Sequence, residues 1–185
     1  MRRLRVFDNV SIDGFFVDAD NDMSWAHKHD AEWNAFTSQN AGGDGALLFG
    51  RITYQMMAAF WTTRQAAEML PEVAAGMNRM PKYVASRTLG CAEWHNTTVL
   101  SGDLVECVRA LKTTPGPDLV ILGSGSLVSQ LSAVRLIDEY QLVINPIALG
   151  RGRTLFETLG GPLPLTRTES RSFGNGNIVV SYTPA

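Results

Sequence analysis

The sequence predicts an α/β fold: a mostly parallel sheet of about eight strands, helices on both faces and an antiparallel hairpin at one edge. Short apolar runs at residues 46–49 and 119–122 are each followed by a glycine and then by a helical pattern. Such runs are typical of strands buried on both sides, as in a parallel sheet. Residues 163–173 and 177–182 lack a helical pattern and are joined by Gly174-Asn175-Gly176, a hairpin signal. Together these observations predict a three-layer α/β/α arrangement with an antiparallel C-terminal edge hairpin.

The composition is that of an ordinary globular protein, so we expect residues 1–185 to form a single domain. Of the 185 residues, 45% are hydrophobic and 18% are charged, and the formal net charge is −2. This length suits one sizeable core. The charge balance offers no basic surface for nucleic acid, and no apolar run is long enough to span a membrane. Cys91 and Cys107 have no metal-ligand spacing, and the missing signal-peptide pattern makes the cytoplasm the expected location.

The N-terminal part predicts a strand and a helix separated by a polar loop. Residues 4–10 form the expected strand, and residues 17–24, rich in Asp and Asn, form a loop in a position to cover a site. A helix is expected to begin at Asp30, a suitable N-cap, and to carry Trp33 and Phe36 on one apolar face.

The pair His27 and His29, close to Asp30, is the pattern nearest to a metal site. Because further ligands are missing, a solvated loop is favoured and no metal is expected.

The middle of the chain predicts further alternation of strands and helices. The expected strands are residues 82–86, 97–100 and 137–144, and the expected helices are residues 51–60, 61–79 and 103–112. Residues 149–153 form a basic glycine-rich turn. We expect Met56, Met57 and Trp61 to be core residues rather than parts of a substrate pocket.

The turn Gly123-Ser124-Gly125-Ser126 lies between a strand and a helix. A helix that begins in such a turn exposes unpaired backbone N–H groups at its positive end, where an anion is stabilised. Glycine also allows a phosphate to approach the backbone without a Cβ in the way. The alternative is a tight turn without a ligand, and this stretch alone leaves both open. It matches neither a Walker loop nor G-x-G-x-x-G.

Three predicted strand ends carry residues that suit a phosphate ligand: Gly50-Arg51-Ile52-Thr53, Ser86-Arg87-Thr88 and Gly123 to Ser126. In an open α/β sheet, ligands bind outside the carboxyl ends of the strands. Two arginines and several hydroxyl groups at that edge suit a ligand with more than one phosphate. The alternative for Arg51 and Arg87 is surface salt bridges.

With these segments in this order, the chain resembles the dihydrofolate reductase-like superfamily. It is most similar to the family named for the reductase domain of bacterial riboflavin biosynthesis, the C-terminal domain of bifunctional deaminase-reductases. The resemblance covers residues 3–182 and rests on five segments, which are Ser11-Ile12-Asp13-Gly14, Phe49-Gly50-Arg51-Ile52-Thr53-Tyr54, Val84-Ala85-Ser86-Arg87-Thr88, residues 121–127, and residues 146–156 with Leu149, Gly150, Gly152, Leu155 and Phe156. It implies a single-domain protein with a dihydrofolate reductase-like fold.

The resemblance implies an NADPH-dependent reductase that transfers hydride to a small heterocyclic or carbonyl compound. It places phosphates at the start of the helix after Gly50, the adenosine 2′-phosphate at Ser86 and Arg87, and the pyrophosphate along residues 123–127. The nicotinamide would approach the strand end at Val10. The implied cofactor-binding residues are Val10, Gly50, Arg51, Thr53, Ser86, Arg87, Thr88, Gly123, Ser124, Gly125, Ser126 and Leu127.

Two further expectations come from the resemblance. It implies a cis or strained peptide bond between Gly123 and Ser124, which is costly unless the surrounding structure holds it. It also implies a homodimer, in which the edge left by the hairpin at residues 163–182 could be covered by a twofold partner.

The chain departs from the riboflavin-pathway pattern after Thr53. The usual Asp-Asp-Pro is replaced by residues 54–61, which contain no carboxylate, so the ribosyl-phosphate pyrimidine substrate is not implied. The spacing of Trp25, Asp30 and Trp33 resembles the dihydrofolate reductase segment whose carboxylate contacts the pterin. Asp30 is therefore a candidate proton source for a pterin-type reductase, with a plain N-cap as the alternative.

Two alternatives remain open. Asp13 either caps the turn before Gly14 or faces the nicotinamide, which makes it a second catalytic candidate. The missing acidic pair after Thr53 also keeps open a nucleotide-binding module that has lost catalysis.

Overall fold

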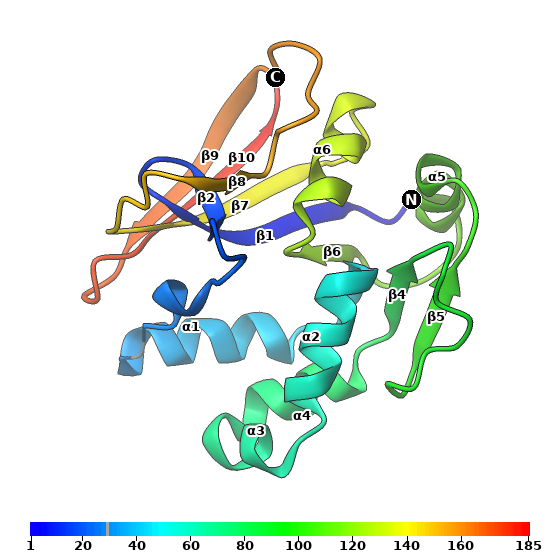
Figure 1. Cartoon of the computed structure of the whole chain (residues 1–185), viewed down its shortest axis with the longest axis horizontal. Coiled ribbons are helices and arrows are strands. Elements are labelled where there is room, and N and C mark those ends of the chain that lie inside the picture. Colours follow the sequence, from blue (N-terminus) through cyan, green and yellow to red (C-terminus); the bar gives the residue numbers. More distant parts are fainter. Residues whose placement is uncertain (29) are drawn as a thin grey trace.

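The computed structural model describes residues 1–28 and 30–185, so the histidine pair at positions 27 and 29 lies partly outside the described residues. Its centre is an eight-stranded sheet in the order β5-β4-β3-β6-β1-β7-β10-β9 (Figure 1). All neighbours up to β7 are parallel, and β10 and β9 are antiparallel. The strands are β1 (Leu4–Ser11), β3 (Ala46–Gly50), β4 (Lys82–Ala85), β5 (Thr97–Leu100), β6 (Leu119–Leu122), β7 (Glu139–Asn145), β9 (Leu165–Ser172) and β10 (Ile178–Pro184). The predicted α/β fold with an antiparallel edge hairpin is therefore confirmed.

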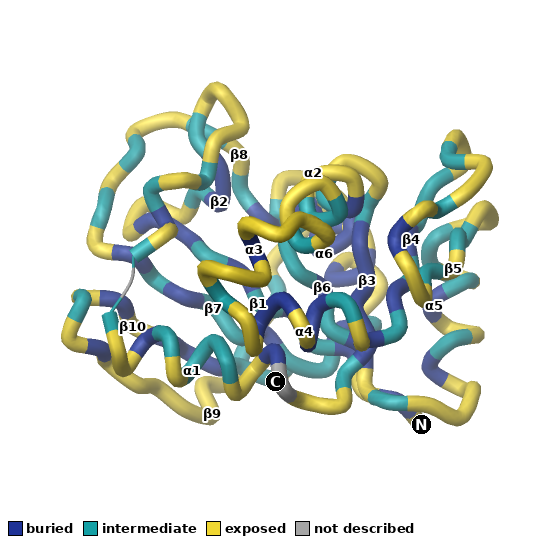
Figure 2. The backbone as a smooth tube through the Cα atoms, turned by 90° about the horizontal axis from the view of Figure 1, so that it is seen from below, coloured by how far each residue is buried: buried dark blue, intermediate teal, exposed yellow. Residues whose placement is uncertain are grey.

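Helices cover both faces of this sheet (Figure 1). One face carries α1 (Ala31–Gly42), α2 (Arg51–Trp61), α3 (Arg64–Met69) and α4 (Pro71–Arg79), and the other carries α5 (Leu104–Thr113) and α6 (Gly125–Ala133). A short 3₁₀ helix (Ser24–Ala26) precedes α1. Figure 2 shows the buried residues concentrated along the strands and the exposed ones along loops and outer helix surfaces. In the described part of the chain, no helix has both the length and the apolar character needed to cross a membrane.

The single helix expected over residues 61–79 is wrong, because the structure has two helices there. Leu70 separates α3 from α4 with φ −138° and ψ 66°. The ring of Pro71 disfavours a helical conformation for the residue before it but suits the first turn of a new helix. The first helix therefore ends before Leu70, and a new helix begins at Pro71.

A second, two-stranded sheet was not expected from the sequence. β2 (Phe15–Asp18) pairs antiparallel with β8 (Gly152–Thr154), in segments predicted partly as a polar loop and as a turn. A Cβ at Gly152, which has φ +156°, would lie 2.1 Å from the carbonyl oxygen of Val17. Only glycine allows the two strands to approach so closely. This pairing joins residues far apart in the sequence, so local patterns do not reveal it.

The outer strand of the hairpin, β9, carries the charged residues Arg167, Glu169 and Arg171. Charged side chains on an edge strand discourage pairing with another sheet edge. The homodimer stays a prediction that rests on the family resemblance and is not assigned to strand pairing at this edge. Light scattering at micromolar concentration tests it: we expect the mass of two chains, and the mass of one chain would contradict it.

Asp8 is a carboxylate inside the core, on the face of β1 that also carries Val6 and Val10. It is only 3% exposed, its Oδ1 accepts a hydrogen bond from the backbone N–H of Asn9, and its Oδ2 is buried without a partner among the described residues. Burial raises the pKa of the Asp8 carboxyl from 3.8 to about 7. The folded protein therefore holds the Asp8 proton more tightly than the unfolded chain does.

This raised pKa predicts a stability that falls with rising pH. The contribution of neutral Asp8 is complete below pH 3.8 and is lost as the pH rises through about 7. Asp8→Asn keeps the acceptor for Asn9 and cannot ionise. Because a difference of one in pKa corresponds to about 1.4 kcal/mol, we expect this variant to be more stable than the wild type at pH 8 by a few kcal/mol, and nearly equal at pH 4. Thermal unfolding at both pH values is the measurement, and parallel pH profiles for the two proteins would contradict it.

Candidate functional site

The structure brings the three predicted phosphate-type segments to one edge of the sheet. They follow β4, β3 and β6, which are consecutive neighbours and run parallel. Gly50 and Ala85 are paired residues at the ends of β3 and β4, so Arg51 and Ser86 leave the sheet side by side. In an open parallel sheet, this carboxyl edge is where ligands bind.

Ser124 joins two of these segments directly. Its hydroxyl donates a hydrogen bond to Oγ1 of Thr53 at 2.8 Å and accepts one from the backbone N–H of Gly50, also at 2.8 Å. Ser124 is the N-cap residue of α6, and Gly50 is the N-cap residue of α2. One buried hydroxyl therefore holds the starts of both helices together.

The first turns of α2 and α6 also lack side-chain caps. Neither Gly50 nor Ser124 supplies a side-chain acceptor for the first helical N–H groups. By contrast, Asp30, Thr63 and Asp103 cap α1, α3 and α5 in the usual way. Two helix starts without side-chain caps thus point their positive ends at the same edge, which suits a phosphate-bearing ligand. In α6 the backbone N–H of Leu127 is already bonded to the carbonyl oxygen of Ser124 at 2.8 Å.

The expected cis peptide bond between Gly123 and Ser124 is wrong, because the described residues contain no cis peptide. The strain lies in the backbone angles instead: Gly123 has φ +60°, and Ser124 has φ +66° and ψ 61°. A left-handed conformation is unfavourable for serine. The two hydrogen bonds of its hydroxyl offset that cost and allow a trans bond to make the turn.

The glycines of this turn are explained first by close packing within the protein. A Cβ on Gly125 would lie 2.5 Å from the ring of Phe16, and one on Gly123 would lie 3.3 Å from the side chain of Thr53. The ring of Phe16, from β2, therefore covers the first residue of α6. Phe16 reaches Gly125 because the pairing of β2 with β8 in the second sheet holds β2 over the turn at residues 123–126.

The two arginines expected at the phosphates lie on the surface at this edge. Arg51 is exposed and donates to Oε1 of Gln55 at 3.0 Å. Arg87 is exposed in a short turn in which the hydroxyl of Ser86 accepts bonds from the backbone N–H groups of Thr88 and Leu89. Neither arginine forms a salt bridge with any residue in the described part of the chain. Both guanidinium groups are available to an anionic ligand.

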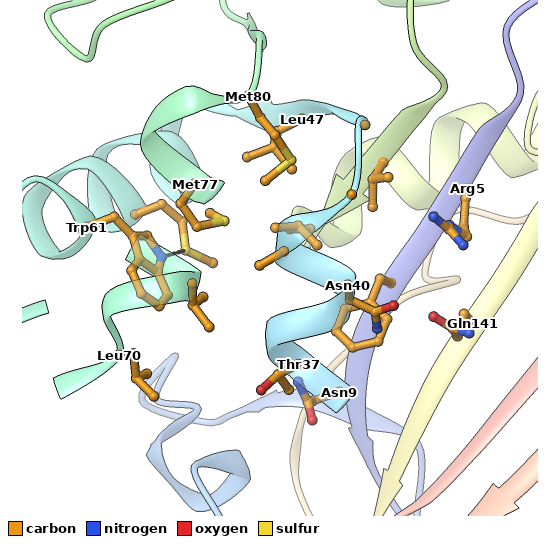
Figure 3. Close-up of a pocket in the computed structure, with 18 of the residues that line it drawn as sticks. Arg5, Asn9, Thr37, Asn40, Leu47, Trp61, Leu70, Met77, Met80 and Gln141 are labelled. Atoms are coloured by element: carbon orange, nitrogen blue, oxygen red, sulfur yellow. Dashed lines mark hydrogen bonds between the residues drawn. The ribbon is translucent and has the colours of Figure 1, made fainter. Parts of the chain in front are cut away.

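A cavity of about 500 Å³ lies between α1 and the sheet, on the side that also carries α2 and α4 (Figure 3). Phe7, Val120 and Leu122 line its sheet side, and Met57 and Trp61 of α2 line its helix side. As expected, Met57 and Trp61 pack against the core cluster that contains Phe49 and Tyr54, and they also face this cavity.

Met56, which was also expected in the core, is 47% exposed. The helix α2 presents Tyr54 to the core and Met56 to the surface, because residues two positions apart lie on different sides of a helix.

Neither catalytic candidate among the carboxylates lines this cavity. Oδ1 of Asp30 accepts a hydrogen bond of 2.7 Å from the backbone N–H of Trp33 and so caps α1. The carboxylate of Asp13 accepts from the hydroxyl of Ser11 and from the backbone N–H groups of Leu149 and Gly150. These bonds, led by the one from Ser11, lower the pKa of Asp13 to about 2, so it is ionised near neutral pH. A catalytic role for either residue stays a prediction.

The remaining predicted cofactor residue, Val10, lies at the end of β1 with its side chain in the core. Only the backbone of Val10 can therefore reach a ligand at the carboxyl edge of the sheet.

Sequence reasoning missed a polar residue of the cavity. Asn9 lines it, and its Oδ1 accepts a hydrogen bond of 3.1 Å from Nδ2 of the buried Asn145. The available signal was an asparagine inside a predicted buried strand, which is an unfavourable place for a polar side chain without a partner.

Comparisons with known proteins place the chain in a family. The model of the RibD C-terminal domain matches residues 2–179. Two proteins of Bacillus subtilis (strain 168), both described as uncharacterised, match nearly the whole chain. YyaP is 27% identical over 98% of this chain and 94% of its own length, and YwjB is 22% identical over 94% and 93%.

Solved structures share the fold. A putative riboflavin biosynthesis protein from Shewanella sp. PV-4 has a TM-score of 0.74 at 22% identity, covering 99% of both chains. A pyrimidine reductase-like protein from Corynebacterium diphtheriae has a TM-score of 0.66 at 15% identity, covering 100% of this chain and 92% of that one.

The third structure is a diaminohydroxyphosphoribosylaminopyrimidine deaminase/5-amino-6-(5-phosphoribosylamino)uracil reductase from Thermotoga maritima. Its TM-score is 0.72 at 13% identity, covering 100% of this chain and 57% of that one. The match to the family model over nearly the whole sequence, on the fold described above, shows that this protein belongs to the RibD C-terminal domain family.

Proposed function

We propose that the protein is an NADPH-dependent reductase that transfers hydride to a small heterocyclic or carbonyl compound. The observation that carries the proposal is the pair of uncapped helix starts at one sheet edge, held together by Ser124 and flanked by Arg51 and Arg87. Membership of the RibD C-terminal domain family supports it, as does the name of the Thermotoga neighbour, which includes a reductase activity.

The residues at this edge fit a dinucleotide that carries an extra phosphate. The first-turn N–H groups of α2 and α6 would hold the pyrophosphate, because unpaired donors at a helix start stabilise negative charge. Arg87, with Ser86 beside it, would hold the 2′-phosphate, and Arg51 would add a second positive charge. Bound NADPH would supply the hydride chemistry, and the protein would supply binding and orientation.

The substrate would occupy the cavity between α1 and the sheet. Its walls include Leu47, Met57, Trp61 and Leu122, which offer an apolar surface to a flat ring. Asn9, near the carboxyl end of β1, brings a polar group to the same cavity. An apolar site with a few polar groups suits a heterocyclic or carbonyl compound.

Preference for NADPH over NADH tests the role of Arg87. A charge-assisted hydrogen bond to phosphate contributes roughly 1.5–3 kcal/mol, so Arg87→Ala should weaken NADPH binding about ten- to a hundredfold and leave NADH binding nearly unchanged. The measurement is the dissociation constant of each cofactor by calorimetry. Arg167→Ala, at the opposite edge of the sheet, is the matched control and should change neither constant. Equal losses for NADPH and NADH in Arg87→Ala would contradict the assignment.

Asp30 is tested by two substitutions. Because asparagine caps a helix as well as aspartate does, we expect Asp30→Asn to keep its stability, so that its turnover reports on proton supply alone. Asp30→Ala should lose about 1 kcal/mol of unfolding free energy, measured in urea. If Asp30→Asn binds NADPH normally but has lost most of its turnover on a demonstrated substrate, Asp30 is the proton source after all.

A further inference from the structure

A buried asparagine controls which way a second asparagine faces in the cavity. Asn145 is fully buried at the end of β7, and its Nδ2 lies 3.1 Å from Oδ1 of Asn9 and 3.2 Å from the carbonyl oxygen of Val143. A longer contact of 3.5 Å reaches the carbonyl oxygen of Val10. Three oxygen atoms thus surround one amide nitrogen.

This arrangement allows only one orientation for the amide of Asn145. Turning it over would bring its oxygen against the backbone carbonyl oxygens of Val143 and Val10, where two acceptors repel. The observed orientation is kept although Oδ1 of Asn145 is buried and has no partner among the described residues. Asn145 therefore acts as a fixed donor.

The fixed donor in turn orients Asn9. If the amide of Asn9 were turned over, its nitrogen would meet the nitrogen of Asn145, and two donors would face each other. Oδ1 of Asn9 must therefore face Asn145, which leaves Nδ2 for the cavity. Within the described part of the chain, Nδ2 of Asn9 has no acceptor. Figure 3 draws Asn9 next to Thr37 of α1, at the end of the cavity away from Arg5.

We propose that Asn9 is a specificity-determining residue that donates a hydrogen bond to a neutral acceptor, a carbonyl oxygen or an imine-type ring nitrogen, of the compound bound in the cavity. Asn145 is the positioning residue that fixes this donor. Because Asn9 lies near the carboxyl end of β1, the acceptor belongs to the part of the compound nearest the cofactor edge. The inference rests on the proposed function in taking this cavity as the substrate site.

The test compares two neutral bicyclic probes that differ only in a carbonyl oxygen, 4-chromanone and chroman. Their dissociation constants are measured by calorimetry or ligand-observed NMR without NADPH, so the result does not depend on cofactor binding. A neutral hydrogen bond predicts that the wild type binds 4-chromanone about three- to tenfold more tightly than chroman. Equal binding of both probes, or binding of neither, would overturn the proposal.

Asn9→Asp and Asn40→Asp form the matched pair of variants. Each replaces an amide by a carboxylate in the lining of the same cavity, but only the first removes the proposed donor. Asn9→Asp still accepts from Asn145 and should lose the preference for 4-chromanone or reverse it. Asn40→Asp should keep it. Retention of the preference in Asn9→Asp, or its loss in both variants, would count against Asn9.

Asn145→Ala tests the positioning role. If Asn145 had only a structural role, the substitution would weaken the binding of both probes equally. If Asn145 positions Asn9, the substitution reduces the preference for 4-chromanone over chroman. In ¹⁵N-labelled wild-type protein, the side-chain amide signals of Asn9 should move on addition of 4-chromanone but not of chroman. This measurement decides the proposal even if a variant fails to fold, and unmoved Asn9 signals would refute it.

Discussion

The arrangement of the candidate site depends on one side chain, the hydroxyl of Ser124. This hydroxyl forms hydrogen bonds both to the backbone N–H of Gly50 and to the hydroxyl of Thr53. It therefore links the ends of β3 and β6 with the starts of α2 and α6. Ser124 reaches both groups because its own backbone adopts a left-handed conformation. The turn is therefore strained, but the strain brings two sets of helix donors to one place. Strain of this kind persists where the surrounding structure holds it, and such positions gather at functional sites.

The helix α1 contacts both the C-terminal hairpin and the cavity. Trp33 and Phe36 pack against Phe173 of the hairpin, with ring centroids 5.0 Å and 5.1 Å apart. This anchors the helix over β7 and β10, and Trp33, Asn34 and Thr37 of the same helix also line the cavity. The antiparallel hairpin thus positions the wall of the candidate substrate site, although it lies far from the glycine-rich turns in sequence.

Buried polar side chains occur on both faces of the central strand β1. On the face toward α6, burial raises the pKa of the Asp8 carboxyl to about 7, so it is neutral below that pH, and its second oxygen has no partner among the described residues. On the opposite face, Asn9 meets a fully buried asparagine that orients it. Burying such groups is unfavourable unless they are hydrogen-bonded. Buried Asp8 lowers the stability of the fold, whereas buried Asn145 turns the amide donor of Asn9 toward the cavity.

The sequence by itself determined the strands of the central sheet, most of the helices and the three ligand-type segments, because these depend on apolar periodicity, glycines and caps within a few residues. The cap at Asp30 and the hairpin around Asn175 are examples. Only the tertiary structure decided what depends on distant contacts. The pairing of β2 with β8, the trans bond held by Ser124, the cavity beside Met57 and the orientation of Asn9 all come from residues that meet across the fold. A local pattern records the propensity of a segment, but not the partner that its polar atoms find after folding.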